Sequence, residues 1–267
     1  MSMIYYKCND NGGLTMYLDN LVLEVTRSCN LKCEHCLRGC SERCHFNTSY
    51  LSNIFDGIEG LNSITFSGGE PLLKIGTIVK TLDYIREHNI SLGSFYIVHN
   101  GTIFSKYLMN ILKDYYENYV SEKEICGFSL SRDKFHLKQI ERLKMRNHYY
   151  DYLDLKEYEY GFDFIADDRK EIGSLIEEGR GKRNRNKIVT RYGHRRPYYF
   201  NGFLREEDYG YDNCTVYVAA NGNVINNCDL SFRTVDKFSF GNIKKTLLIE
   251  IIQSNQVSGR DLVRIEL

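Results

Sequence analysis

Three cysteines stand close together at Cys29, Cys33 and Cys36, in the spacing C-x3-C-x2-C. Two more, Cys40 and Cys44, follow within the same short stretch. Thiols crowded in this way indicate metal binding. Structural zinc is commonly held by four protein ligands, whereas an iron-sulfur cluster held by three cysteines leaves one iron free to bind another molecule. The spacing therefore predicts a metal cluster and favours iron-sulfur over structural zinc.

A second candidate site is the segment Ser67-Gly68-Gly69-Glu70-Pro71, which directly follows a predicted strand at 63–66. Paired glycines allow a ligand to come close to the backbone. The carboxyl ends of strands are also where folds of repeated βα units bind their ligands. We therefore expect Gly68, Gly69 and Glu70 to take part in ligand binding.

Short β-rich runs alternate with amphipathic stretches from residue 21 to about residue 166, as in repeated βα units with parallel strands. The expected strands cover residues 21–26, 63–66, 95–98, 125–130 and 160–165. Apolar residues at helical spacing predict helices over 51–58, 75–85 and 104–115. These apolar faces are interpreted as core.

The chain changes character after residue 178, where residues 180–197 carry eight Lys or Arg and no acid. Further on, two β-rich runs at 215–218 and 223–225 flank Asn221-Gly222, a dipeptide suited to a tight hairpin turn. Residues 244–253 have the spacing of a closing helix. We therefore predict two units, a larger one over 1–198, with N-terminal strands in 1–20, and a C-terminal extension over 199–267.

Composition sets the broad class of protein. The 267 residues have 42% apolar and 26% charged side chains, which is ordinary for a globular protein and excludes wholesale disorder. The formal net charge is zero, which argues against a dedicated nucleic-acid binder. No stretch approaches the ~20 apolar residues that span a bilayer, and no signal peptide is recognisable, so we expect a cytoplasmic protein with reduced thiols.

The ordered pair of motifs, C-x3-C-x2-C after the first strand and Gly68-Gly69-Glu70-Pro71 after the second, resembles the radical S-adenosylmethionine (radical SAM) enzymes. The resemblance implies an α/β fold, a partial (β/α)6 TIM-like barrel, here with a small C-terminal β-hairpin plus helix extension. It also implies a 4Fe-4S cluster that binds S-adenosylmethionine. One electron from the cluster then cleaves the cofactor to methionine and a 5′-deoxyadenosyl radical, which abstracts hydrogen from a substrate.

The resemblance assigns candidate roles to individual residues. Cys29, Cys33 and Cys36 match the cluster ligands, and Gly68, Gly69 and Glu70 match the segment that contacts the methionine amino group. His35 occupies a position that is usually aromatic in the family and is expected near the adenine.

Three later segments are similar to further cofactor-binding elements of the family. Asn100 belongs to an Asn-Gly-Thr turn, and residues 129–136 look like the Ser-x-Asp-x-x-His segment of many members. In that segment Ser129, Ser131 and Arg132 could hydrogen-bond the ribose or the carboxylate, and Arg suits a bidentate carboxylate contact. Asp133 fits a helix N-terminal carboxylate at least as well as a cofactor contact, and His136 is interpreted as structural. Arg180 lies in a Gly-Arg element, as a cofactor contact or in a solvated basic loop.

The C-terminal extension resembles a truncated SPASM or twitch domain, a module that holds auxiliary 4Fe-4S clusters. Only Cys214 and Cys228 are local, whereas an auxiliary cluster needs about four thiolates. We therefore expect a cap without a cluster and keep a second iron-sulfur cluster as the alternative. Cys40 and Cys44 could share a helix face and complete a composite site, while Cys8 and Cys126 are expected to be buried as small hydrophobes.

The leading functional hypothesis is a radical SAM enzyme that modifies a ribosomally made peptide, because the extensions it resembles are common in peptide maturases. Its partners would be a peptide or small-molecule substrate and a flavodoxin- or ferredoxin-like electron donor, without nucleic acid or membrane. The alternatives are modification of a nucleotide or RNA, suggested by the basic stretch 180–197, and activation of a glycyl radical enzyme. A non-catalytic zinc module would explain the cysteines but not Gly68-Gly69-Glu70-Pro71.

Overall fold

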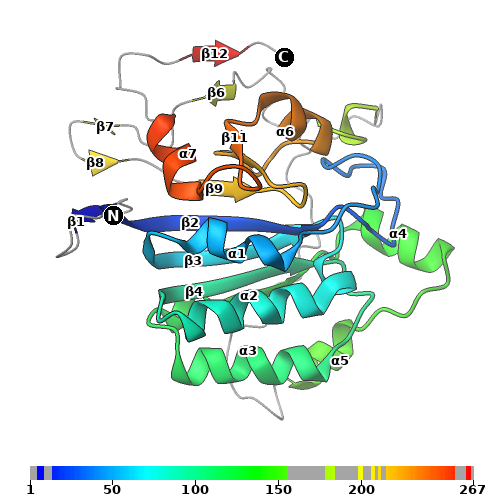
Figure 1. Ribbon diagram of the computed structural model, residues 1–267. Helices are drawn as coiled ribbons and strands as arrows, with labels where there is room; N and C mark the ends of the chain where they lie inside the picture. Colours follow the sequence, from blue (N-terminus) through cyan, green and yellow to red (C-terminus); the bar gives the residue numbers. More distant parts are fainter. Residues whose placement is uncertain are drawn as a thin grey trace.

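An eight-stranded sheet forms the centre of the molecule in the computed structural model (Figure 1). The structure describes residues 5–8, 14–155, 178–183, 198–200, 206–207, 210–211, 215–255 and 263–265. The strand order is β11-β10-β9-β2-β3-β4-β5, with β1 paired to β2. Neighbours from β9 to β5 are parallel, and the pairs β9/β10, β10/β11 and β1/β2 are antiparallel.

The strands of this sheet are β1 (Tyr5–Cys8), β2 (Leu14–Thr26), β3 (Ile58–Gly68), β4 (Ser91–His99), β5 (Gly127–Leu130), β9 (Thr215–Val218), β10 (Asn223–Ile225) and β11 (Gly241–Asn242). Two separate two-stranded sheets pair β6 (Tyr198–Phe200) with β12 (Val263–Ile265), and β7 (Glu206–Glu207) with β8 (Gly210–Tyr211). Strands β2, β3 and β4 contain the runs predicted at 21–26, 63–66 and 95–98. The run predicted at 125–130 is strand only from Gly127, because Ile125 ends a 3-10 turn, and the run at 160–165 lies outside the described residues.

The register of the parallel strands aligns apolar side chains into layers. Leu21 is paired with Ile64, and Ile64 with Phe95, and all three are fully buried. Runs of buried apolar residues are typical of parallel strands that are covered on both faces. Because β2, β3, β4 and β5 are parallel, their carboxyl ends lie at one edge of the sheet, where the cysteine and Gly-Gly-Glu segments begin.

Seven α-helices are described: α1 (Leu51–Phe55), α2 (Ile75–Glu87), α3 (Lys106–Asn118), α4 (Lys134–Arg142), α5 (Tyr149–Asp154), α6 (Phe232–Phe238) and α7 (Leu248–Ser254). Single 3-10 turns occur at η1 (Thr48–Tyr50), η2 (Pro71–Lys74), η3 (Lys123–Ile125) and η5 (Gly181–Arg183). The apolar faces predicted at 75–85 and 104–115 are confirmed, since Ile78, Leu82, Leu108 and Leu112 are fully buried. Ser105 caps α3 by accepting the N–H of Leu108.

One predicted helix is too long at its end. The spacing of Leu51, Ile54 and Ile58 predicts a helix over 51–58, but α1 ends at Phe55 and Ile58 begins β3. Gly57 has φ +82°, a left-handed conformation that stops the helix, and its carbonyl accepts the N–H of Met16 on β2. Sheet pairing therefore overrides the helical spacing of Ile58.

The C-terminal hairpin is confirmed, and the closing helix predicted over 244–253 is confirmed in part, since α7 begins at Leu248. β9 and β10 are antiparallel around a turn in which Gly222 has φ +90°. The hairpin does not stand apart, because β9 lies parallel to β2 in the main sheet and α7 contacts α1. The architecture is therefore a mostly parallel, partial barrel-like α/β sheet completed by C-terminal antiparallel strands and a helix, as predicted. Among the described residues, no helix has the length and apolar character needed to cross a membrane.

Candidate metal and cofactor site

The three cysteines of the C-x3-C-x2-C motif lie in an irregular loop that leaves the carboxyl end of β2. Cys33 is 4% exposed and packs with Leu31, Phe135 and Ile140, while Cys29 and Cys36 lie at the border of this apolar cluster. Burial is the main cause that raises the pKa of the Cys29 thiol to about 11 and that of Cys33 to about 12. Nearness to the other thiols of the motif raises both pKa values further. The loop thus gathers three thiols that a metal centre would have to deprotonate on binding.

The Gly-Gly-Glu segment is fastened to the start of this loop by backbone hydrogen bonds. The N–H of Gly69 donates to the Thr26 carbonyl at 2.7 Å, and the N–H of Glu70 donates to the Ser28 carbonyl at 2.9 Å. A Cβ on Gly69 would stand 2.5 Å from the Ser28 carbonyl oxygen. Gly68, at φ +147°, has no room for a Cβ beside the Thr26 carbonyl. The paired glycines were expected to let a ligand come close to the backbone. In this structure the groups that lie close to Gly68 and Gly69 are the backbone carbonyls of Thr26 and Ser28.

Glu70 is 1% exposed, and its carboxylate joins two loops. Oε1 accepts the N–H of Leu72 at 3.1 Å, and Oε2 accepts the N–H of Asn100 at 2.8 Å. Burial raises the pKa of Glu70 to about 7, although these two hydrogen bonds oppose the rise. The residue predicted to bind an amino group therefore also holds the loops after β3 and β4 together.

Asn100 extends this connection to the first cysteine. Its Nδ2 donates to Asn30 Oδ1 at 2.9 Å and lies 4.0 Å from Cys29 Sγ. Thr102 donates from its backbone N–H and its hydroxyl to Asn100 Oδ1, and Asn30 Nδ2 donates to Thr102 Oγ1 at 2.7 Å. A closed ring of side-chain hydrogen bonds thus orients the amide of Asn100 beside a predicted cluster ligand.

His35 lies in a hydrogen-bonded triad with two residues at the beginning of α4. Its Nε2 is 3.3 Å from Asp133 Oδ2, and His136 Nδ1 is 2.6 Å from the same oxygen. Burial raises the pKa of Asp133, but hydrogen bonds from His136 and His35 outweigh it and hold the pKa well below its ordinary value. The His35 ring also stacks on Phe135, with ring centroids 4.7 Å apart.

Donor atoms of His35, Asp133 and His136 lie within 4.8 Å of one another, so this set could hold a metal ion. The other oxygen of Asp133, Oδ1, caps α4 by accepting the N–H groups of Phe135 and His136. Since both carboxylate oxygens are already engaged, the geometry is that of a hydrogen-bonded support for the His35 ring. The structural interpretation of Asp133 as a helix cap is thereby confirmed.

Four further predicted residues lie at the same edge of the sheet. Ser129 is buried near the end of β5, and the N–H of Ser131 donates to the His99 carbonyl at 2.8 Å. The guanidinium of Arg132 lies 3.8 Å from the ring centroid of Tyr149. Arg180 packs on the cysteine loop, donating from Nε to the Cys33 carbonyl at 2.8 Å and from its backbone N–H to the Cys36 carbonyl at 2.9 Å. Arg180 is therefore a support of the loop rather than part of a solvated one.

Sequence reasoning missed a buried charge cluster next to the cysteine loop. Arg27 is 2% exposed, bonds Glu24 through Nε at 2.7 Å, and makes two 2.7 Å bonds to Asp236 of α6. Glu24 also accepts the hydroxyl of Tyr217 on β9. Two features of the sequence were indications of this cluster: Glu24 is an acid within an apolar strand, and Arg27 stands two residues before Cys29. Their partners lie about two hundred residues away in sequence and could not be read from it.

The additional cysteines are scattered among the described residues. Residues 36–44 form turns and bends and not a helix. The possibility that Cys40 and Cys44 share a helix face is therefore wrong. Cys40 is exposed, Cys44 packs against the main core, and Cys228 packs against a C-terminal apolar cluster. Cys126 is buried as expected, whereas Cys214 and the side chain of Cys8 lie outside what the structure describes.

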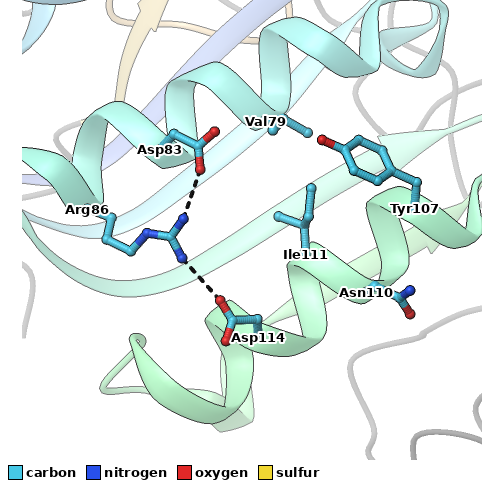
Figure 2. A pocket seen from close by; sticks show the side chains of 7 residues that line it. All are labelled: Val79, Asp83, Arg86, Tyr107, Asn110, Ile111 and Asp114. Carbon is cyan, nitrogen blue, oxygen red and sulfur yellow. Dashed lines mark hydrogen bonds and ion pairs between the residues drawn. The ribbon is translucent and has the colours of Figure 1, made fainter.

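A surface groove between α2 and α3 contains none of the predicted site residues (Figure 2). Arg86 bridges its two sides, with bonds of 3.0 Å to Asp83 and 3.1 Å to Asp114. Among the described residues, the groove is lined only by residues of α2 and α3, and none of these lining residues belongs to the cysteine loop.

The residues around the cysteine loop fit a 4Fe-4S cluster and a polar ligand on it. The donor set is three thiols, one ligand short of a closed tetrahedral zinc site. In the described part of the chain, buried atoms without a hydrogen-bond partner include Nδ1 of His35, inside the motif, and Oε1 of Gln139, on the helix that covers Cys33. Buried polar atoms are normally satisfied, so these two are free to bond a ligand.

Comparison with known proteins supports this interpretation. Residues 21–126 match the family model of the 4Fe-4S single cluster domain. An uncharacterized protein of Methanocaldococcus jannaschii is 28% identical over 101 residues, which are 36% of this chain and 35% of that protein. The chain thus spans about a third of the length of this relative.

Two solved structures are similar at low identity. One is native anSMEcpe with bound AdoMet and the Cp18Cys peptide, at 17% identity and a TM-score of 0.47, covering 90% of this chain and 80% of that one. The other is Streptococcus suis SuiB bound to the precursor peptide SuiA, at 15% identity and a TM-score of 0.41, covering 88% and 64%. The family match and the three-thiol loop together show a 4Fe-4S domain in this chain, with the cysteine motif inside the matched residues.

Proposed function

We propose that this protein is a radical SAM enzyme that cleaves S-adenosylmethionine reductively and abstracts hydrogen from a peptide substrate. The observation that carries the proposal is the connection of the cysteine loop to the Gly-Gly-Glu segment through Glu70, Asn100 and Asn30. When bound, the reduced cluster supplies the electron that converts S-adenosylmethionine into methionine and a 5′-deoxyadenosyl radical, which takes hydrogen from the substrate.

The residues of this chain hold and orient the cofactors. Cys29, Cys33 and Cys36 would be the cluster ligands, and Arg180 and Asn100 fix the loop that carries them. Gly68, Gly69 and Glu70 would line the methionine end of the cofactor. His35, oriented by Asp133, would face the adenine, and Ser129, Ser131 and Arg132 would complete the binding edge.

A peptide substrate is proposed because the C-terminal segment resembles the extensions of peptide maturases. The hairpin β9–β10 and the Gly241-Asn242 strand extend the main sheet beyond β2, and α7 contacts α1. These C-terminal strands are an addition that a simple βα repeat lacks.

The test is anaerobic reconstitution with iron and sulfide, followed by Ti(III) citrate and S-adenosylmethionine, with quantification of 5′-deoxyadenosine. We expect product from the wild type and none from Cys33→Ala. Cys126→Ala is the matched control because Cys126 is buried near β5, outside the motif, and should leave product formation intact. Absence of product from the wild type, with zinc bound to the thiols, would contradict the proposal.

Iron content tests the expectation that the C-terminal extension holds no second iron-sulfur cluster. We expect about four irons per chain, the content of a single 4Fe-4S cluster. About eight irons per chain would show that a second cluster is present and would contradict this part of the proposal. For the substrate, a peptide pool is incubated with the reconstituted enzyme, and a mass change that requires S-adenosylmethionine is the expected result.

A further inference from the structure

The helix that covers Cys33 has two contrasting faces. On its inner face, Phe135 and Ile140 of α4 pack with Cys33 in one apolar cluster. On its outer face, Lys134, Lys138 and Arg142 follow one another at intervals of four residues and are all exposed. Figure 1 shows α4 at the edge of the molecule, next to the loop that carries the cysteines. A single helix therefore separates a predicted cluster ligand from a basic surface.

The positive charge of this surface is local. Residues 134–146 contain five Lys or Arg and one acid, Glu141, in a chain whose formal net charge is zero. Arg146 is ion-paired with Asp151 and Lys138 with Glu34, so Lys134, Arg142 and Lys144 supply most of the net positive charge of this surface. Lys138 is joined to the cysteine loop itself by a 2.9 Å ion pair with Glu34. Both of these side chains remain largely exposed.

The basic surface also carries apolar contact area. Leu137 and Leu143 are 37% and 43% exposed, although most large apolar side chains that the structure describes are buried. We define the α4 surface as Lys134, Leu137, Lys138, Arg142, Leu143 and Lys144.

We propose that the α4 surface docks an acidic one-electron carrier protein that reduces the cluster. This inference rests on the proposed function, because only a redox cluster needs a reductant. Opposite charge brings such a donor to the outer face of α4, the helix whose inner face packs on Cys33. One electron then passes from the reduced carrier, which is oxidised, to the oxidised cluster, which is reduced.

The test compares a protein donor with a small chemical donor. The variant Arg142→Glu/Lys144→Glu reverses two exposed charges on the α4 surface and leaves the ion pair of Lys138 with Glu34 in the cysteine loop intact. The matched control, Lys80→Glu/Lys106→Glu, reverses two charges at exposed positions of α2 and α3. Reconstituted proteins are mixed with reduced flavodoxin at low ionic strength, and cluster reduction is followed by stopped-flow absorbance. In parallel, 5′-deoxyadenosine is measured with Ti(III) citrate as the reductant.

We expect the α4 variant to be reduced by flavodoxin about tenfold more slowly than the wild type, a usual size for lost electrostatic steering. The control should keep the wild-type rate, and added salt should slow the wild type toward the variant. Product formation with Ti(III) citrate should be equal in all three. Equal rates with flavodoxin, or an equal loss in the control, would overturn the inference. A loss with Ti(III) citrate in the α4 variant alone would also overturn it, by indicating structural damage.

Failure of the proposed function can be distinguished from failure of the docking inference. It fails if the wild type gives no 5′-deoxyadenosine with Ti(III) citrate, whichever rates flavodoxin produces.

Discussion

The Glu70 carboxylate accepts the backbone N–H of Asn100 at 2.8 Å, and this bond links the loops that follow β3 and β4. The other carboxylate oxygen accepts the N–H of Leu72. A carboxylate can serve two N–H donors at once, one on each oxygen, whereas an amide has only one acceptor oxygen. The chemical identity of residue 70 is therefore tied to the geometry of the site as well as to any ligand contact.

Glu70→Gln should destabilise the protein by about 1–3 kcal/mol, because one buried N–H would face an amide group and lose its acceptor. We also expect weaker binding of S-adenosylmethionine, since the loop at Asn100 would be released from the one at Glu70. Thermal unfolding and equilibrium binding to the reconstituted protein measure the two effects. The exposed control Glu87→Gln should change stability by less than about 0.5 kcal/mol. A Glu70→Gln variant as stable as the wild type would disprove the linking role.

Gly69→Ala should impair cluster retention. Its Cβ would meet the Ser28 carbonyl oxygen at 2.5 Å, so the backbone just before Cys29 would have to move. We expect fewer irons per chain and a lower melting temperature.

Gly76→Ala is the matched control for the glycine experiment. Nothing lies within 4 Å of a Cβ built at Gly76, which is in α2. Alanine favours a helix over glycine by up to about 1 kcal/mol, so this variant should be equal to or more stable than the wild type, with full iron content. Normal iron content in Gly69→Ala would show that the close approach to Ser28 is not needed.

Asp236→Asn should loosen the C-terminal segment from the cysteine loop. Arg27 is buried and makes two 2.7 Å bonds to Asp236, so removal of the charge leaves the guanidinium with less compensation. We expect a loss of about 2 kcal/mol in the free energy of unfolding, typical of charge-assisted hydrogen bonds. The comparison is Asp114→Asn in the exposed pair with Arg86, which should cost less than about 1 kcal/mol. Equal effects of the two substitutions on denaturant unfolding would refute the role of this ion pair.

His99 should make the fold sensitive to acid. Burial lowers the pKa of His99 to about 3, against 6.5 ordinarily, so the folded protein holds the ring neutral while the unfolded chain protonates it. Stability from this group is fully present above pH 6.5 and is lost as the pH falls toward 3, by about 1.4 kcal/mol for each pH unit. His99→Phe should remove this part of the pH dependence between pH 6 and 4.

The pH experiment compares unfolding free energies of His99→Phe, His88→Gln and the wild type across that range. His88 is exposed at the end of α2, so its variant should follow the wild-type curve. A His99→Phe curve parallel to that of the wild type would contradict the prediction.

The sequence by itself determined the parallel strands at 21–26, 63–66 and 95–98, the helices α2 and α3, and the C-terminal hairpin. It also pointed to the cysteines and the Gly-Gly-Glu segment as the site. These features depend on periodic burial and on turn residues, which are local properties of the chain.

Only the tertiary structure decided the partners of the buried polar groups. The bonds of Glu70 to Asn100 and of Arg27 to Asp236 join residues that are distant in sequence, and no local pattern specifies them. The same applies to Ile58, whose helical spacing yields to pairing with β2, because strand pairing is a nonlocal interaction that can outweigh helix propensity. The basic outer face of α4 is also visible in the sequence. Its position over Cys33 depends on how the helix packs, and therefore on the fold.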